Sequence, residues 1–168
     1  MASHRIIRPV VPFLLAAVLP LMAATSRVEV SFVDPAHYTD AGNDPSDARS
    51  NEETLARYLR DLGSQYLAPG LSLEIDVLDI DLAGTVRPPL GQISSLRILR
   101  GGADWPRIKL HYSLREDGSI VSQGEEVVAD LNYLHDGRVV GHSVPLAYEK
   151  RMLENWFRKR FGGLKANG

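Results

Sequence analysis

The segment 71–83, LSLEIDVLDIDLA, constrains the fold more than any other part of the chain, because its apolar alternation changes phase halfway along. Apolar residues occupy alternate positions from Leu73 to Val77 and the opposite set of alternate positions from Leu78 to Leu82, with acidic residues between them. A straight strand cannot keep both halves facing one core, since a slip of one residue exchanges the two faces. We therefore predict one strand that carries an extra residue, a β-bulge, near Val77-Leu78.

Two segments carry apolar residues at helical spacing. The first follows Ser50-Asn-Glu-Glu53, which has the Ser-x-x-Glu spacing of a capping box, and it predicts a helix over 51–67. The polar stretch 36–49 before it is expected to be a loop. The second segment predicts a helix over 146–161 that ends at Gly162-Gly163. Its apolar stripe consists of Met152, Leu153, Trp156, Phe157 and Phe161.

Four more segments are predicted as strands: 27–33, 93–100, 107–115 and 119–133. Asp117-Gly118 predicts a hairpin between the last two, because such pairs adopt the positive φ that tight turns require. In the last strand, the residues expected to face inward are Val127, Ala129, Leu131 and Tyr133. A second Asp-Gly pair, Asp136-Gly137, predicts a further turn.

The resulting order, β-α-β-β-β-β-α, predicts an α+β fold. We expect a mostly antiparallel sheet of about four to five strands with two helices packed on one face. The opposite face is expected to be half-solvated. The residues assigned to it are Glu74, Asp76, Lys109, His111, Glu126 and Asp130.

Residues 1–24 have the three parts of a cleavable secretory signal: Arg5 and Arg8, an apolar run over 10–21, and small residues at the end. Cleavage is expected after Ala24 or Ala23, leaving residues 25–168 as a single domain without stable membrane insertion. An uncleaved N-terminal anchor is the alternative. The chain has no cysteine, so neither disulfides nor a lipid anchor can form. In a Gram-negative source the expected location is the periplasm.

Charge argues against a nucleic-acid partner. The chain has 19 basic and 21 acidic side chains, and loss of Arg5 and Arg8 leaves 17 and 21, a net charge of −4. Nucleic-acid binders normally show a basic surplus. The one basic cluster, Arg158-Lys159-Arg160 with Lys165, lies at a predicted helix end, where cations complement the helix dipole.

Carboxylates and histidines are the candidate metal ligands. Asp76, Asp79 and Asp81 could supply oxygen ligands, but the glycine and final glutamate of a calcium loop are missing. His135 and His142 are not at a zinc spacing. The sequence also lacks a Gly-x-Ser-x-Gly elbow and a phosphate-binding loop. We therefore predict no catalytic set, no metal and no cofactor.

Two segments, 100–107 (RGGADWPR) and 130–133 (DLNY), place aromatic and charged residues close together. Exposed Trp and Tyr beside Arg are typical contact anchors. The alternative for Trp105 is a structural one, in which the ring plugs the open edge of the core. The candidate binding surface consists of Asp104, Trp105, Arg107, Asp130, Asn132 and Tyr133.

The phrases VEVSFVDPAHYTDAG, LEIDVLDIDLAG, RGGADWPRIKLHYSL, GEEVVADLNYL and LAYEKRMLENWFRKRF occur in this order over nearly all of residues 25–168. With them the chain resembles the bacterial exported family called domain of unknown function 3016. The resemblance implies export and a single domain. It implies no reaction, cofactor or catalytic residue.

Three hypotheses about function follow. The first is a non-enzymatic exported protein that binds an envelope protein or a small ligand through its polar sheet face or the turn around Trp105. The second is a small hydrolase, with or without a metal, that uses carboxylates such as Asp79, Asp81, Asp104 or Asp130. The third is an accessory subunit of an envelope assembly, which an apolar patch left exposed on the sheet would support.

Overall fold

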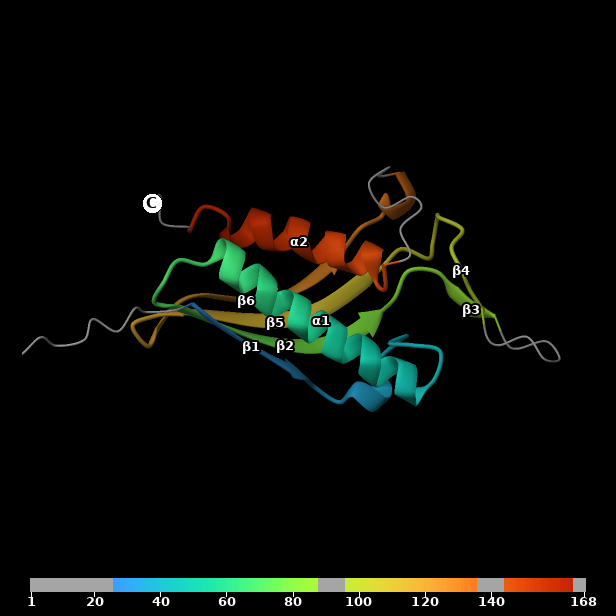
Figure 1. Ribbon diagram of the computed structural model, residues 1–168, viewed down its shortest axis with the longest axis horizontal. Helices are drawn as coiled ribbons and strands as arrows, with labels where there is room; N and C mark the ends of the chain where they lie inside the picture. The colour runs from blue at the N-terminus through green and yellow to red at the C-terminus, as the bar shows by residue number, and fades with distance from the viewer. Residues whose placement is uncertain (1–25, 88–95, 136–143, 165–168) are drawn as a thin grey trace, which may run out of the picture.

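The computed structural model describes residues 26–87, 96–135 and 144–164 (Figure 1). The predicted signal, the turn at Asp136-Gly137, His142 and Lys165 lie outside these residues. None of the described helices is long and apolar enough to cross a membrane. The helices and strands are β1 (Arg27–Phe32), α1 (Pro45–Tyr66), β2 (Leu71–Asp81), β3 (Thr85–Arg87), β4 (Leu96–Ile98), β5 (Arg107–Glu116), β6 (Ser119–Ala129) and α2 (Ala147–Phe161).

The main sheet has the strand order β1-β2-β5-β6, and both helices lie on one of its faces (Figure 1). β1 and β2 run parallel and are joined by α1, the crossover connection that a parallel pair needs, whereas β2–β5 and β5–β6 are antiparallel. The predicted α+β fold with a mostly antiparallel sheet is confirmed. Within the described residues, the strand predicted over 93–100 is limited to β4, which pairs with β3 in a separate two-stranded sheet.

The predicted bulge in β2 is confirmed. Val77 pairs with Leu110 and Asp79 with Lys109, so Leu78 is the extra residue. The bulge returns the second half of the strand to the core, since Val77 and Ile80 are 2% and 0% exposed.

The predicted start of α1 is wrong. The helix begins at Pro45, and the side chain of Asp44 accepts hydrogen bonds from the amides of Ser46 (2.8 Å) and Asp47 (3.0 Å). Asp44 thus caps the first turn, and proline at the first helical position has no amide that needs a partner. Ser50 lies inside the helix, so the expected capping box does not form and the expected loop ends at Asp44.

The core lies between the helices and the sheet. α1 contributes Leu55, Leu59 and Leu62, and the stripe predicted on α2 is buried as expected. Tyr112 of β5 meets two rings of that stripe edge-on. An ideal Cβ on Gly63 would lie 2.0 Å from Val28 Cγ2, so only glycine allows α1 to sit this close to β1.

The predicted phase of β6 is wrong. Val127 and Leu131 are each 62% exposed, Ala129 is exposed too, and Val128 is the buried residue. The pairing with β5 decides this, because it sets Val128 opposite buried Ile108.

The same phase turns Glu126 toward the helices instead of the opposite face. There its carboxylate accepts hydrogen bonds from Trp156 Nε1 (2.9 Å) and from the Arg160 guanidinium. Tyr133 is buried as predicted, but it lies in a 3₁₀ turn after the strand.

Candidate functional site

A pocket of about 590 Å³ opens where the end of β2, β4 and the first turns of α1 and α2 meet. We call it the Arg97 pocket. It combines two carboxylates, two side-chain amides and a guanidinium with an apolar wall. Its lining residues are Asn43, Asp47, Asn51, Leu82, Ala83, Arg97, Leu99, Val144, Pro145, Leu146, Ala147, Tyr148 and Glu149.

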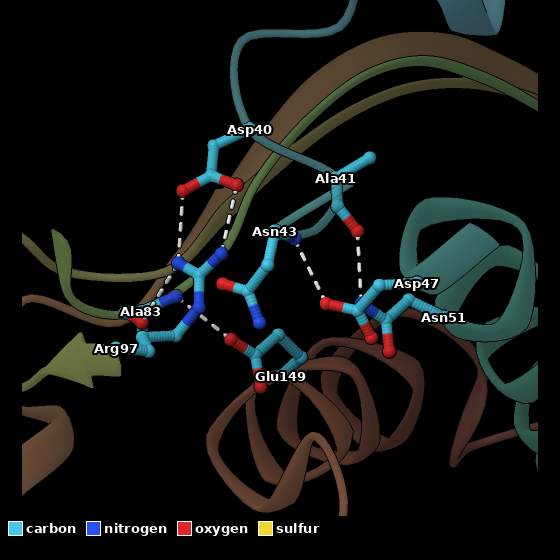
Figure 2. Close-up of polar contacts among 8 residues, drawn as sticks. All are labelled: Asp40, Ala41, Asn43, Asp47, Asn51, Ala83, Arg97 and Glu149. Atoms are coloured by element: carbon cyan, nitrogen blue, oxygen red, sulfur yellow. Dashed lines mark hydrogen bonds and ion pairs between the residues drawn. The ribbon is translucent and has the colours of Figure 1, made fainter. Parts of the chain in front are cut away.

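Arg97 makes a two-pronged ion pair with Asp40, in which Nη1 and Nη2 each donate to one carboxylate oxygen at 2.8 Å (Figure 2). Nη1 also lies 3.3 Å from the carbonyl oxygen of Ala83. The side chains of Arg97 and Asp40 are each 21% exposed. Burial lowers the pKa of Arg97, but the hydrogen bonds and charge of Asp40 outweigh it, so the pKa is raised and the guanidinium stays charged.

Glu149 comes from the first turn of α2 and is only 3% exposed. Its Oε1 accepts a hydrogen bond of 2.8 Å from the amide of Ala83, which belongs to the segment leaving β2 (Figure 2). Burial raises the pKa of Glu149, and the hydrogen bond from Ala83 and the charge of Arg97 offset only part of that rise. A carboxyl group with a raised pKa in a pocket is typical of functional sites, although structural networks produce it too.

The α1 side of the pocket is fixed by short local contacts. Asp47 accepts a hydrogen bond of 2.8 Å from the amide of Asn43, and Asn51 Nδ2 donates to the carbonyl of Ala41 at 2.9 Å (Figure 2). Asp40 is held against β2, where its amide donates to the carbonyl of Ile80 at 2.8 Å. The loop that carries Asp40 is thereby fastened both to the sheet and to the helix.

Gly84 allows β4 to approach the end of β2. Its φ is +89°, and an ideal Cβ there would lie 2.7 Å from the carbonyl oxygen of Ile98. Any other residue would be strained by the dihedral angle and would also clash. Arg97, the neighbour of Ile98, therefore depends on this glycine for its position beside Asp40.

The structure brings part of the predicted binding surface together. Tyr133 donates to Asp104 Oδ1 at 2.8 Å, and the amide of Arg100 donates to Asp104 Oδ2 at the same distance. Burial, followed by the hydrogen bond to Asp104, raises the pKa of Tyr133 to about 12. Asp130 binds Arg151 at 2.6 Å, and Arg151 also donates to the carbonyl of Tyr133. These bonds tie the turn before β5 to the segment after β6 and to α2.

The other predicted surface residues take no part in that network of side chains. Arg107 forms an ion pair of 2.6 Å with Asp81, and Trp105 is half-buried. Asn132 is exposed, and its amide donates to Asp130 Oδ1 at 3.0 Å. Whether these six residues bind a partner stays a prediction.

We call the face of the main sheet that the helices do not cover the open face. The carboxylates of β2 on this open face each have a partner. Asp76 accepts from Ser31 (2.5 Å) and lies 3.8 Å from His111. Asp79 accepts from the amide (2.7 Å) and the hydroxyl (2.8 Å) of Thr39. Within residues 26–87, 96–135 and 144–164, no group of three or more histidine, aspartate or glutamate side chains is arranged to hold a metal.

Sequence reasoning missed Asp40, Arg97 and Glu149. Asp40 and Arg97 are 57 residues apart, and Glu149 is 66 residues from its partner Ala83, so no local spacing connects them. One signal was present in retrospect: Leu82-Ala83-Gly84 and Tyr148-Glu149, both in phrases that carry the family resemblance, meet at this pocket.

The fold and the pocket define a small α+β domain with a polar site at one end of its sheet. The chain belongs to the family described as "Protein of unknown function (DUF3016)", whose model matches residues 26–159. No curated protein and no solved structure matches the chain.

Proposed function

We propose that residues 1–24 direct export to the periplasm and that the remaining domain is a non-enzymatic binding protein. Its ligand, in this proposal, is a small organic cation with an apolar part, which enters the Arg97 pocket. The observation that carries the proposal is the excess of acidic side chains at the pocket: Asp47 and the buried Glu149 remain there once Arg97 is paired with Asp40.

Charge favours a cation. Asp40 and Arg97 neutralise each other, and the remaining acidic side chains that line the pocket are the carboxylates of Asp47 and Glu149. Both lie within reach of a ligand in the pocket, Asp47 from the first turn of α1 and Glu149 from the first turn of α2. An ammonium group brought near Asp47 would gain a charge-assisted hydrogen bond. An anion would meet an uncompensated carboxylate.

The wall favours a ligand with an apolar part. The apolar wall of the Arg97 pocket consists of Leu82, Leu99, Pro145 and Leu146. Leu99 is 38% exposed, so part of this wall is accessible to a ligand. Small-molecule sites are mostly apolar with a few placed polar groups, which is the composition found here. No specific observation favours the hydrolase, because Asp79, Asp81, Asp104 and Asp130 all accept hydrogen bonds within the domain.

Calorimetric titration with three matched probes tests the binding proposal: phenethylamine, 2-phenylethanol and 3-phenylpropionate. Phenethylamine is expected to bind most tightly and the carboxylate least. Asp47→Asn keeps the acceptor for Asn43 but removes the charge, so it should weaken phenethylamine by about tenfold. Trp105→Ala, outside the pocket, should leave the affinity unchanged. Equal binding of all three probes, or a loss caused by Trp105→Ala alone, would refute the assignment.

Export has its own test. The protein expressed with residues 1–24 in a Gram-negative host should be recovered from the periplasmic fraction. Its N-terminal residue should be Thr25, or Ala24 if cleavage follows Ala23. Recovery of the intact chain in the membrane fraction would instead support the uncleaved anchor.

A further inference from the structure

The Arg97 pocket contains a buried acid without an ion-pair partner. Among the described residues, two ionic side chains are buried: Arg151, which is 9% exposed, and Glu149, which is 3% exposed. Arg151 forms an ion pair of 2.6 Å with Asp130. Glu149 accepts a hydrogen bond from the Ala83 amide, but it forms no ion pair with any side chain that the structure describes. Burial of an uncompensated charge is unfavourable, so the ionised form of Glu149 would be stabilised by a cation in the pocket.

Arg97 does not supply that cation. It is the one base among the described residues that line the pocket, and its Nη1 and Nη2 each donate to Asp40 at 2.8 Å. Burial raises the pKa of Glu149, and the charge of Arg97 offsets only part of that rise. The negative charge of Glu149 is therefore available to a ligand.

Asp47 is a second carboxylate of this kind. It comes from the first turn of α1, whereas Glu149 comes from the first turn of α2. Asp47 accepts from the Asn43 amide at 2.8 Å (Figure 2), and it has no ion-pair partner within residues 26–87, 96–135 and 144–164. The helix dipole favours negative charge in the first turn of a helix. The pocket thus presents two carboxylates that are carried by two different helices.

We propose that the ligand of the Arg97 pocket is a diamine, with one ammonium group beside Asp47, the other beside Glu149, and the carbon chain against the apolar wall. This inference rests on the proposed function, which requires only one ammonium group. A single cation leaves one of the two carboxylates uncompensated, whereas two ammonium groups form a charge-assisted hydrogen bond with each. The methylene groups between them cover Leu99 and Leu146, which line the same pocket.

Other charged ligands fit the pocket less well. The carboxylate of a zwitterionic amino acid would be repelled by Asp47 or Glu149. A quaternary ammonium group has no N–H to donate to these carboxylates. A divalent metal ion needs several ligands that converge, and the described part of the chain has no group of three or more histidine, aspartate or glutamate side chains so arranged. Two positive charges separated by a carbon chain match two carboxylates on separate helices.

Calorimetric titration of the protein with unbranched diamines of three to six carbons tests the proposal. Each diamine is compared with the amino alcohol of the same length, in which a hydroxyl replaces one ammonium group. The best-fitting diamine should bind at least about tenfold more tightly than its amino alcohol. Among the four-carbon compounds, 4-aminobutyrate should bind least, because its carboxylate meets an acidic pocket.

Glu149→Gln assigns the second ammonium group. Glutamine retains an acceptor for the Ala83 amide but removes the charge. The variant should weaken the diamine by about tenfold, while the amino alcohol, whose ammonium group lies beside Asp47, should lose less than about threefold. Asp61→Asn is the matched control, because it removes one charge from an exposed position of α1 outside the pocket. It should leave both affinities unchanged.

Two results would overturn the diamine assignment while leaving the proposed function in place, provided that phenethylamine still binds. One is a diamine that binds no more than about twofold more tightly than its amino alcohol, the factor expected from two equivalent ends. The other is an equal loss of both ligands in Glu149→Gln. If no amine binds, phenethylamine included, the proposed function fails and the diamine assignment fails with it.

Discussion

Two regions of this domain use the same residue types in opposite ways. On the open face of the sheet, acids of β2 stand opposite bases of β5: Asp81 pairs with Arg107 and Asp76 with His111. These side chains are partly exposed, from 20% to 48%. In the Arg97 pocket, Asp40 and Arg97 share a two-pronged pair beside Glu149, which is 3% exposed.

The difference in burial determines what each region contributes. Exposed ion pairs are screened by water, so the open face resembles a solvated surface with a fixed register. A buried carboxyl group must find partners because its desolvation is unfavourable. We therefore expect a fold to retain such a group where it has a role other than stability. The pocket is therefore the more informative place to look for function, although the open face has more charges.

Substitution in the core beneath both regions should cause the largest loss of stability. Trp156→Ala is expected to lower the free energy of unfolding by about 3–5 kcal/mol, since the ring is 9% exposed and packs against Phe157, Phe161 and Tyr112. Chemical denaturation measures it. A loss below about 1 kcal/mol would mean that α2 presents Trp156 outside the core.

Glu149→Ala should be the most damaging change in the pocket. It leaves the Ala83 amide without its acceptor and opens a small cavity, so a loss of about 2–4 kcal/mol is expected. Glu149→Gln retains an acceptor for that amide and should cost about 1 kcal/mol or less. If both variants unfold at the same denaturant concentration, the hydrogen bond to Ala83 is not what Glu149 contributes.

The pH dependence of stability measures how protonation of Glu149 contributes to folding. Because burial raises its pKa in the folded state, the folded protein holds the proton more tightly than the unfolded chain. The resulting stabilisation is complete below the unfolded value of about 4.5 and is lost as the pH rises through the folded value. The difference in unfolding free energy, wild type minus Glu149→Gln, should therefore fall as the pH is raised above 4.5. A flat difference would contradict a raised pKa.

Substitutions on the open face should change the free energy of unfolding least. A double-mutant cycle on Lys109 and Glu125, with glutamine at each position, should give a coupling of less than about 1 kcal/mol, because both side chains are about half exposed. High salt should reduce it further. A coupling as large as the loss in Glu149→Ala would remove the distinction between the two regions.

Local patterns predicted the elements whose signal lies within one segment. The bulge at Leu78 follows from the change of phase in β2, and the stripe of α2 follows from helical spacing. Two local signals competed at the start of α1, and Asp44-Pro45 prevailed over Ser50, so the helix begins about one and two-thirds turns earlier than the capping box predicted.

The remaining errors arise from contacts between distant segments. Val127 and Val128 are both valine, so alternation alone could not decide which faces inward; the register with β5 did. Glu126 could turn inward only because Trp156 and Arg160 offer it partners from another element. The Arg97 pocket joins segments 57 and 66 residues apart, and no spacing within a segment predicts that meeting.

The central claim is that the Arg97 pocket, and not the open face, is where this domain binds a ligand. Titration of the isotope-labelled protein with phenethylamine, followed by amide chemical shifts, tests it most directly. The amides of Ala83, Arg97 and Glu149 should shift in a saturable way, while those of Lys109 and His111 on the open face stay in place. Shifts confined to Lys109, His111 and their neighbours, or no saturable shift in any amide, would contradict it.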